Sequence, residues 1–133
     1  MTEPTWTDPD AVLARVEDQI REAQAHAERA RDLESQMRTI VGRAASPDNA
    51  VTAAVSASGL VTDLALTEAA LEQHERDLAR TIQETINAAH RSVGEQAVAL
   101  SAEAFGEDSA VTHRLRDEAA EREKLPNDPD ITY

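Results

Sequence analysis

Apolar residues recur at every third or fourth position in two long stretches of the chain, and at every second position in a short stretch between them. The first long stretch has a 3-4 spacing broken by Glu34, and its apolar positions are Leu13, Val16, Ile20, Ala23, Ala27, Ala30, Met37 and Val41. This spacing predicts an amphipathic helix of about thirty residues with a narrow, alanine-rich seam suited to packing against another helix. Asp8 as N-cap and Pro9 at the first helical position mark its start. Gly42 is expected to end it.

The alternating stretch covers residues 50–66 and reads as two strands joined by a turn. Apolar or β-branched residues fall at every second position on both sides of the turn: Val51, Ala53, Val55 and Ala57, then Leu60, Thr62, Leu64 and Leu66. Because Gly59 tolerates positive φ, the break at Ser58-Gly59 predicts a β-hairpin. A weaker strand over residues 43–46 and a turn over residues 46–49 complete a three-stranded antiparallel meander. We expect helix to cover one face of this sheet.

A second long helix follows the hairpin, after a short helical turn capped by Thr67. Its apolar positions again have a 3-4 spacing and comprise Leu78, Ile82, Ile86, Ala89, Val93, Ala97, Leu100 and Ala104. Gly106 is its natural stop. The predicted organisation is a disordered leader over residues 1–7, an α+β domain over residues 8–106, and an acidic, disordered tail over residues 107–133. Within the tail, residues 109–124 can form a transient helix.

Composition limits the stability of a single protomer. The chain holds one Trp, one Tyr and one Phe, so its core must be built from small aliphatic side chains that bury little area each. We therefore expect an obligate homodimer. The absence of cysteine excludes disulfides and thiolate metal sites. No apolar stretch approaches the roughly 20 residues of a membrane span, and the acidic N-terminus is unlike a secretory signal, so a cytoplasmic protein is expected.

The order of the predicted elements, a long helix, three strands, a short helix and a long helix, resembles the YbaB/EbfC family of nucleoid-associated proteins. Members carry a strand of the type V-x-V-x-V, a Gly turn, and G-x-V-x-x-L-x-L before a short helix. Residues 51–66 stand in that register, and LARTIQETINAA at residues 78–89 is similar to the opening of the family's last helix. The resemblance covers roughly residues 10–104. It implies an interlocked homodimer with helices projecting as paired arms that bind duplex DNA in the nucleoid.

Basic side chains on the two long helices are the candidates for phosphate contact. Six arginines are predicted to bind nucleic acid: Arg31, Arg38, Arg43, Arg76, Arg80 and Arg91. The helical spacing places Arg31 and Arg38 on one face of the first helix, and the last three on one face of the second. Such contacts hold the DNA backbone without reading its bases. The alternative is that these arginines neutralise nearby carboxylates, since the net charge is −13 and an acidic chain is repelled by phosphate.

Other chemistry is not indicated. The four histidines form no HxxxH-type ligand set, and no catalytic triad or phosphate-binding loop is present. We therefore predict a non-enzymatic, cofactor-free protein of the nucleoid whose partners are a second copy and duplex DNA. One alternative is an acidic member of the fold that has lost DNA binding and acts as a protein-interaction adaptor. Another is a prefoldin-like holdase, which also places hairpins between long helices. Trp6 either anchors a partner or folds back onto its own dimer. The acidic tail either keeps the protein soluble or is autoinhibitory, competing with DNA for a basic patch.

Overall fold

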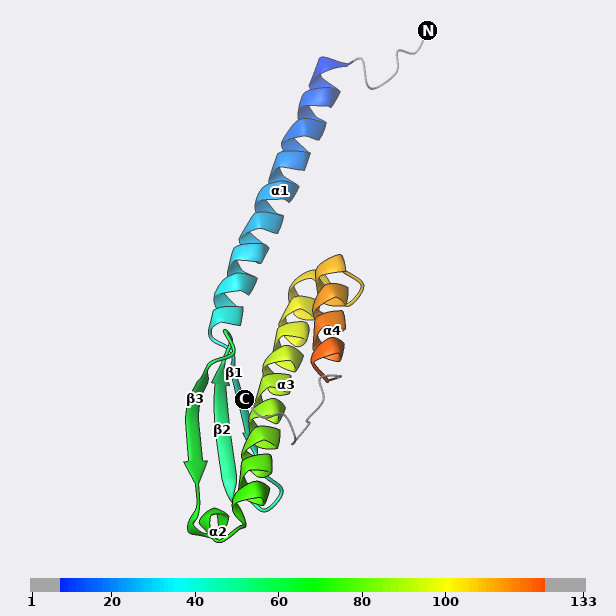
Figure 1. Ribbon diagram of the computed structural model, residues 1–133. Helices are drawn as coiled ribbons and strands as arrows, with labels where there is room; N and C mark the ends of the chain where they lie inside the picture. Colours follow the sequence, from blue (N-terminus) through cyan, green and yellow to red (C-terminus); the bar gives the residue numbers. More distant parts are fainter. Residues whose placement is uncertain (1–7, 124–133) are drawn as a thin grey trace.

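A computed structural model describes residues 8–123, so the predicted leader over residues 1–7 and the end of the predicted tail lie outside the described residues. The elements follow in the order α1 (Pro9–Arg38), β1 (Val41–Ala45), β2 (Val51–Ser56), β3 (Val61–Leu66), α2 (Glu68–Leu71), α3 (Glu75–Phe105) and α4 (Ala110–Glu123). One long helix projects from a small sheet, and the other lies across it (Figure 1). The predicted α+β class and the order of its elements are confirmed.

The long helix α1 begins as predicted. The Asp8 side chain accepts a hydrogen bond from the backbone N–H of Asp10, and Pro9 occupies the first turn. Its end was predicted wrongly. The helix ends at Arg38 with Thr39 as C-cap, and Gly42 lies inside β1. Gly42 does not end a helix. Its missing side chain lets α3 pack directly against β1.

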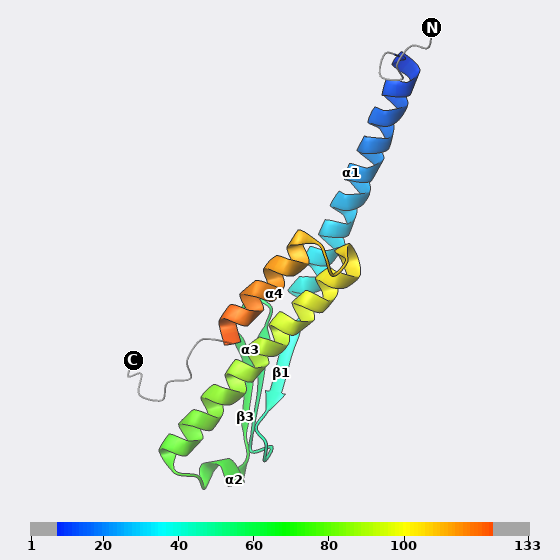
Figure 2. The ribbon, with the colours of Figure 1, turned by 90° about the vertical axis from the view of Figure 1, so that its right-hand side faces the viewer.

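The sheet is antiparallel with the order β1-β2-β3, so the meander is confirmed, with its first strand at Val41–Ala45. Helix α3 covers β1 and β2, and Figure 2 shows it lying against the sheet. Val51, Ala53 and Val55 of β2 are buried. The edge strand β3 is exposed along its whole length, including Leu64 and Leu66. The protomer therefore leaves an apolar sheet edge uncovered.

Both predicted turns are confirmed. In the β1–β2 turn, Asn49 has φ 59°, and the Ser46 hydroxyl donates to the Asp48 carboxylate at 2.7 Å. This bond, together with one from the backbone N–H of Ala50, lowers the pKa of the Asp48 carboxyl below its ordinary value. In the hairpin turn, Gly59 has φ 92°, a conformation that L-residues rarely adopt. Turn chemistry read from the sequence thus fixes both reversals of the sheet.

Residues 107–123 belong to the tail that was predicted to be disordered. In the structure the chain turns at Gly106, and the following residues form α4, which packs against α3. A cluster of buried hydroxyls holds this turn. The Thr112 hydroxyl donates to the carbonyl of Gly106 at 2.8 Å, so it must accept from Ser101 and Ser109, both at 2.8 Å. Ser101 and Thr112 are fully buried. The turn between α3 and α4 is held by polar side chains, so the sequence of α4 shows little apolar periodicity. This is why the sequence pattern predicted disorder.

Thr112→Val is expected to loosen α4 from α3. Valine matches threonine in shape but leaves the buried Ser101 hydroxyl and the Gly106 carbonyl without their partner, at a cost of about 1–3 kcal/mol. Urea unfolding gives the change in free energy, and hydrogen exchange shows whether the α4 amides open first. Thr81→Val is the matched control, since the Thr81 hydroxyl is bonded to its own helix at an exposed position. Equal effects of the two variants would contradict this role of the cluster.

Candidate nucleic-acid interface

The six predicted arginines do not form one patch on the protomer. They lie on three surfaces, namely α1 (Arg31 and Arg38), β1 (Arg43) and α3 (Arg76, Arg80 and Arg91). Each surface has its own neighbouring charges.

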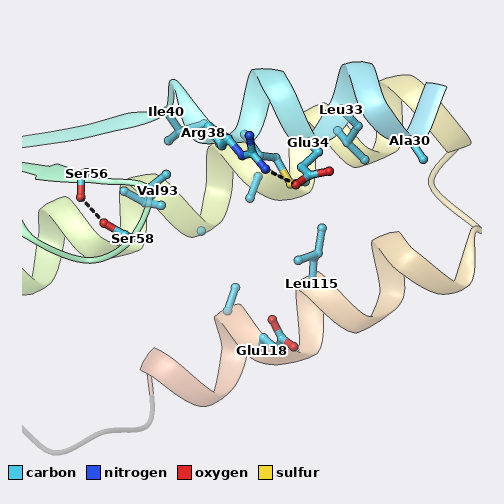
Figure 3. Close-up of a pocket in the computed structure, with 15 residues that line it drawn as sticks. Ala30, Leu33, Glu34, Arg38, Ile40, Ser56, Ser58, Val93, Leu115 and Glu118 are labelled. Atoms are coloured by element: carbon cyan, nitrogen blue, oxygen red, sulfur yellow. Dashed lines mark hydrogen bonds and ion pairs between the residues drawn. The ribbon is translucent and has the colours of Figure 1, made fainter. Parts of the chain in front are cut away.

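On α1, Arg38 is paired with a carboxylate of its own helix. Its guanidinium contacts Glu34 one turn earlier, and both side chains are largely exposed (Figure 3). Exposed pairs of this kind contribute only about 0–1 kcal/mol, so the pair can be exchanged for another anion. No carboxylate among residues 8–123 forms an ion pair with Arg31. The α1 surface therefore offers one free and one loosely paired cation.

Arg43 points to the face of the sheet opposite α3. Its neighbour Gly42 faces α3, and successive strand residues alternate between faces. Arg43 is in register with Ala54 of β2, which in turn is in register with Asp63 of β3. These three residues line a shallow hollow of about 390 Å³. Arg43 is thus separated from the α3 arginines by the thickness of the sheet and shares its hollow with a carboxylate.

The three α3 arginines share one helix face, as the spacing predicts. None of them forms an ion pair with a carboxylate in the described part of the chain. Glu84 interrupts the stripe, and together with Asp48 and Arg91 it lines a polar hollow of about 510 Å³ beside the β1–β2 turn. This helix face therefore presents three arginines that have no ion pair among residues 8–123, although carboxylates lie next to them.

A larger hollow was not predicted from the sequence. It is an apolar groove of about 570 Å³ between α1, the hairpin turn, α3 and α4. Figure 3 shows Leu33 of α1 and Leu115 of α4 on opposite sides of it. The signal that could have pointed to it is the α1 seam, since Ala30 and Met37 also line the groove. Most of its lining is apolar, but Glu34, Arg38 and Glu118 stand at its edges, so the groove offers phosphate a single arginine beside two carboxylates.

Among residues 8–123, no group of three or more His, Asp or Glu side chains is placed to hold a metal ion. No helix in that range has both the length and the apolar character needed to cross a membrane.

The chain matches the model of a known protein family. The model of the YbaB/EbfC DNA-binding family matches residues 13–107. The matched range starts inside α1 and ends just after α3, so α4 lies beyond it. No curated protein and no solved structure matches the chain.

Proposed function

The chain belongs to the YbaB/EbfC DNA-binding family, and from this premise we propose that it is a non-enzymatic, nucleoid-associated protein of the cytoplasm that binds duplex DNA as a homodimer. The observation that carries the proposal is the family match, which spans most of α1, the whole sheet and all of α3. The absence of any base-reading motif in the sequence supports binding with little sequence specificity.

The α3 stripe is the favoured contact surface. Arg76, Arg80 and Arg91 are presented by one rigid helix face and are free of ion pairs with the described carboxylates. A homodimer doubles this set to about six phosphate contacts. Arg31, Arg38 and Arg43 are secondary candidates, because they are divided between two surfaces and Arg38 is paired with Glu34.

Self-association is supported by what a single protomer leaves exposed. Within the described part of the chain, Leu64 and Leu66 on β3 lie beyond the cover of α3, and Leu13, Val16 and Ile20 on α1 are likewise exposed. Contiguous exposed apolar side chains often mark a surface that binds another protein, whereas single exposed apolar residues are common on any protein. A second copy can bury them.

Salt dependence tests the proposed function. Binding of the full chain to a random-sequence duplex, followed by fluorescence anisotropy, is expected to weaken about 10³-fold between about 50 and 200 mM salt if six phosphates are neutralised. The physical reason is the release of condensed counterions, which becomes less favourable as salt rises. Absence of binding at the lower salt, or binding unaffected by salt, would contradict the proposal.

The second candidate function is a protein-interaction adaptor that has lost DNA binding. It is favoured by the net charge of −13 and by the separation of the six arginines on three surfaces. An acidic surface of this kind is complementary to a basic protein. The salt experiment separates the two candidates, because an adaptor is expected to give no anisotropy change with duplex DNA at either salt concentration.

A further inference from the structure

The N-terminal half of α1 has no packing partner among residues 8–123 of its own protomer. Helix α3 ends level with the middle of α1, where the rings of His26 and Phe105 lie 5.1 Å apart, and Figures 1 and 2 show α1 continuing well beyond this point. Along that free half, Leu13, Val16 and Ile20 are 57%, 42% and 51% exposed. Three large aliphatic side chains on one helix stripe are costly to leave in water.

The C-terminal half of the same seam lies in the apolar groove. Ala30, Leu33 and Met37 form the α1 side of this groove, and Leu115 of α4 stands across it (Figure 3). Val93, Gly94 and Ala97 of α3 line it further. Helix α1 therefore carries an exposed apolar stripe in its N-terminal half and, in its C-terminal half, one wall of a mostly apolar groove that no side chain among residues 8–123 fills.

We propose that the N-terminal half of α1 docks in this groove of a second copy, with the two α1 helices antiparallel about a two-fold axis. The proposal rests on the homodimer of the proposed function and assigns an interface to it. Leu13 then faces the partner's Met37, Ile20 faces the partner's Ala30, and Ala23 faces the partner's Ala27 at the axis. A two-fold contact is reciprocal, so each protomer both fills a groove and has its own filled. The small residues at the axis allow the helices to approach closely.

Charge complementarity selects this arrangement. In the antiparallel register, Glu17 flanks the partner's Arg31, and Asp10 flanks the partner's Arg38, giving four opposite-charge contacts by symmetry. Residues flanking a helical seam set partner choice and orientation. A parallel pair would give no opposite-charge flank and would place Glu34 beside the partner's Glu34 in the seam, whereas the antiparallel register places Glu34 opposite the partner's Val16 and avoids this like-charge contact.

This assignment changes the role of the α1 arginines. Arg31 has no ion pair with a described carboxylate in the protomer, and Arg38 has only its exposed pair with Glu34. Both become contacts to a second copy, so the α3 stripe remains as the phosphate surface. The arrangement also gives α4 a role: this helix lies outside the family match and forms one wall of the groove in which the partner's α1 docks.

Engineered disulfides test the register, because the chain holds no cysteine. Full-length Ile20→Cys and Ala30→Cys proteins are mixed in a redox buffer. We expect a disulfide-linked dimer from the mixture and little from either variant alone, since only unlike positions face each other. The matched control is a mixture of Glu22→Cys and Glu28→Cys, which lie at the same height on the outer face of the helix. Linkage of Ile20→Cys to itself, or equal yields from test and control mixtures, would overturn the proposal.

Charge exchange tests the flanking pairs in the same background. Glu17→Arg on both chains is expected to reduce the linked dimer at least about tenfold, because like charges then face each other. Glu17→Arg on the Ile20→Cys chain and Arg31→Glu on the Ala30→Cys chain should restore it, since all flanks are again opposite. Failure of this rescue would count against the register. If linkage fails while DNA binding persists, only this inference falls, whereas linkage without DNA binding removes only the proposed function.

Discussion

Gly42→Ala is expected to lower the free energy of unfolding by about 3 kcal/mol or more, an effect at the upper end of overpacking substitutions. A Cβ atom at this position would lie 2.0 Å from the carbonyl oxygen of Ala89 and 2.7 Å from Cγ2 of Val93. The first of these neighbours is backbone of α3, so relief requires the whole helix to shift. Such a shift would disturb the packing of Val55, Ala89 and Val93, which belong to the main buried cluster.

Urea denaturation compares this variant with the parent and with Gly106→Ala. Gly106 has φ 91° and ψ 157° and no atom within 4 Å of an added Cβ, so the control carries backbone strain of about 1–3 kcal/mol without a clash. If the two variants lose the same stability, then α3 does not press on β1 at Gly42. A lower slope of free energy against urea would indicate a looser folded state.

Residue 42 also shows where sequence patterns mislead. Glycine ends helices and permits close packing, and the chain gives no local sign of which role applies. The seam of α1, the alternation of the hairpin and the Ser46–Asn49 turn were predictable because each depends on residues close in sequence. Gly42 depends on Ala89, which comes close only after α3 folds across the sheet.

The candidate site was less predictable than the fold for a related reason. Helical spacing correctly places Arg76, Arg80 and Arg91 on one face, because that geometry is local. It carries no information on how that face is oriented relative to α1 or to the outer face of β1. The apolar groove was missed because α4 was expected to be disordered, and its fastening by Thr112 and Ser101 leaves no apolar period in the sequence.

The triple variant Arg76→Ala, Arg80→Ala, Arg91→Ala is expected to lose at least about 10²-fold in affinity for duplex DNA at about 50 mM salt. The loss follows from removing the cations on α3 that have no ion pair with a described carboxylate. The slope of log affinity against log salt should flatten by about 0.9 for each phosphate contact removed. Anisotropy titrations at several salt concentrations measure both quantities, and circular dichroism checks that α3 still folds.

A second triple variant, Arg15→Ala, Arg21→Ala, Arg114→Ala, makes the same change in net charge elsewhere. Arg21 and Arg114 have exposed carboxylate neighbours at 3.8 Å, so losing them should alter DNA affinity and salt slope much less. Because both variants are equally more acidic than the parent, a difference between them reports on position and not on overall repulsion. Equal losses would mean that the total charge governs DNA binding, and the α3 face would then have no special role. An unchanged slope in the α3 variant would instead move the phosphate contacts to Arg43 or to α1.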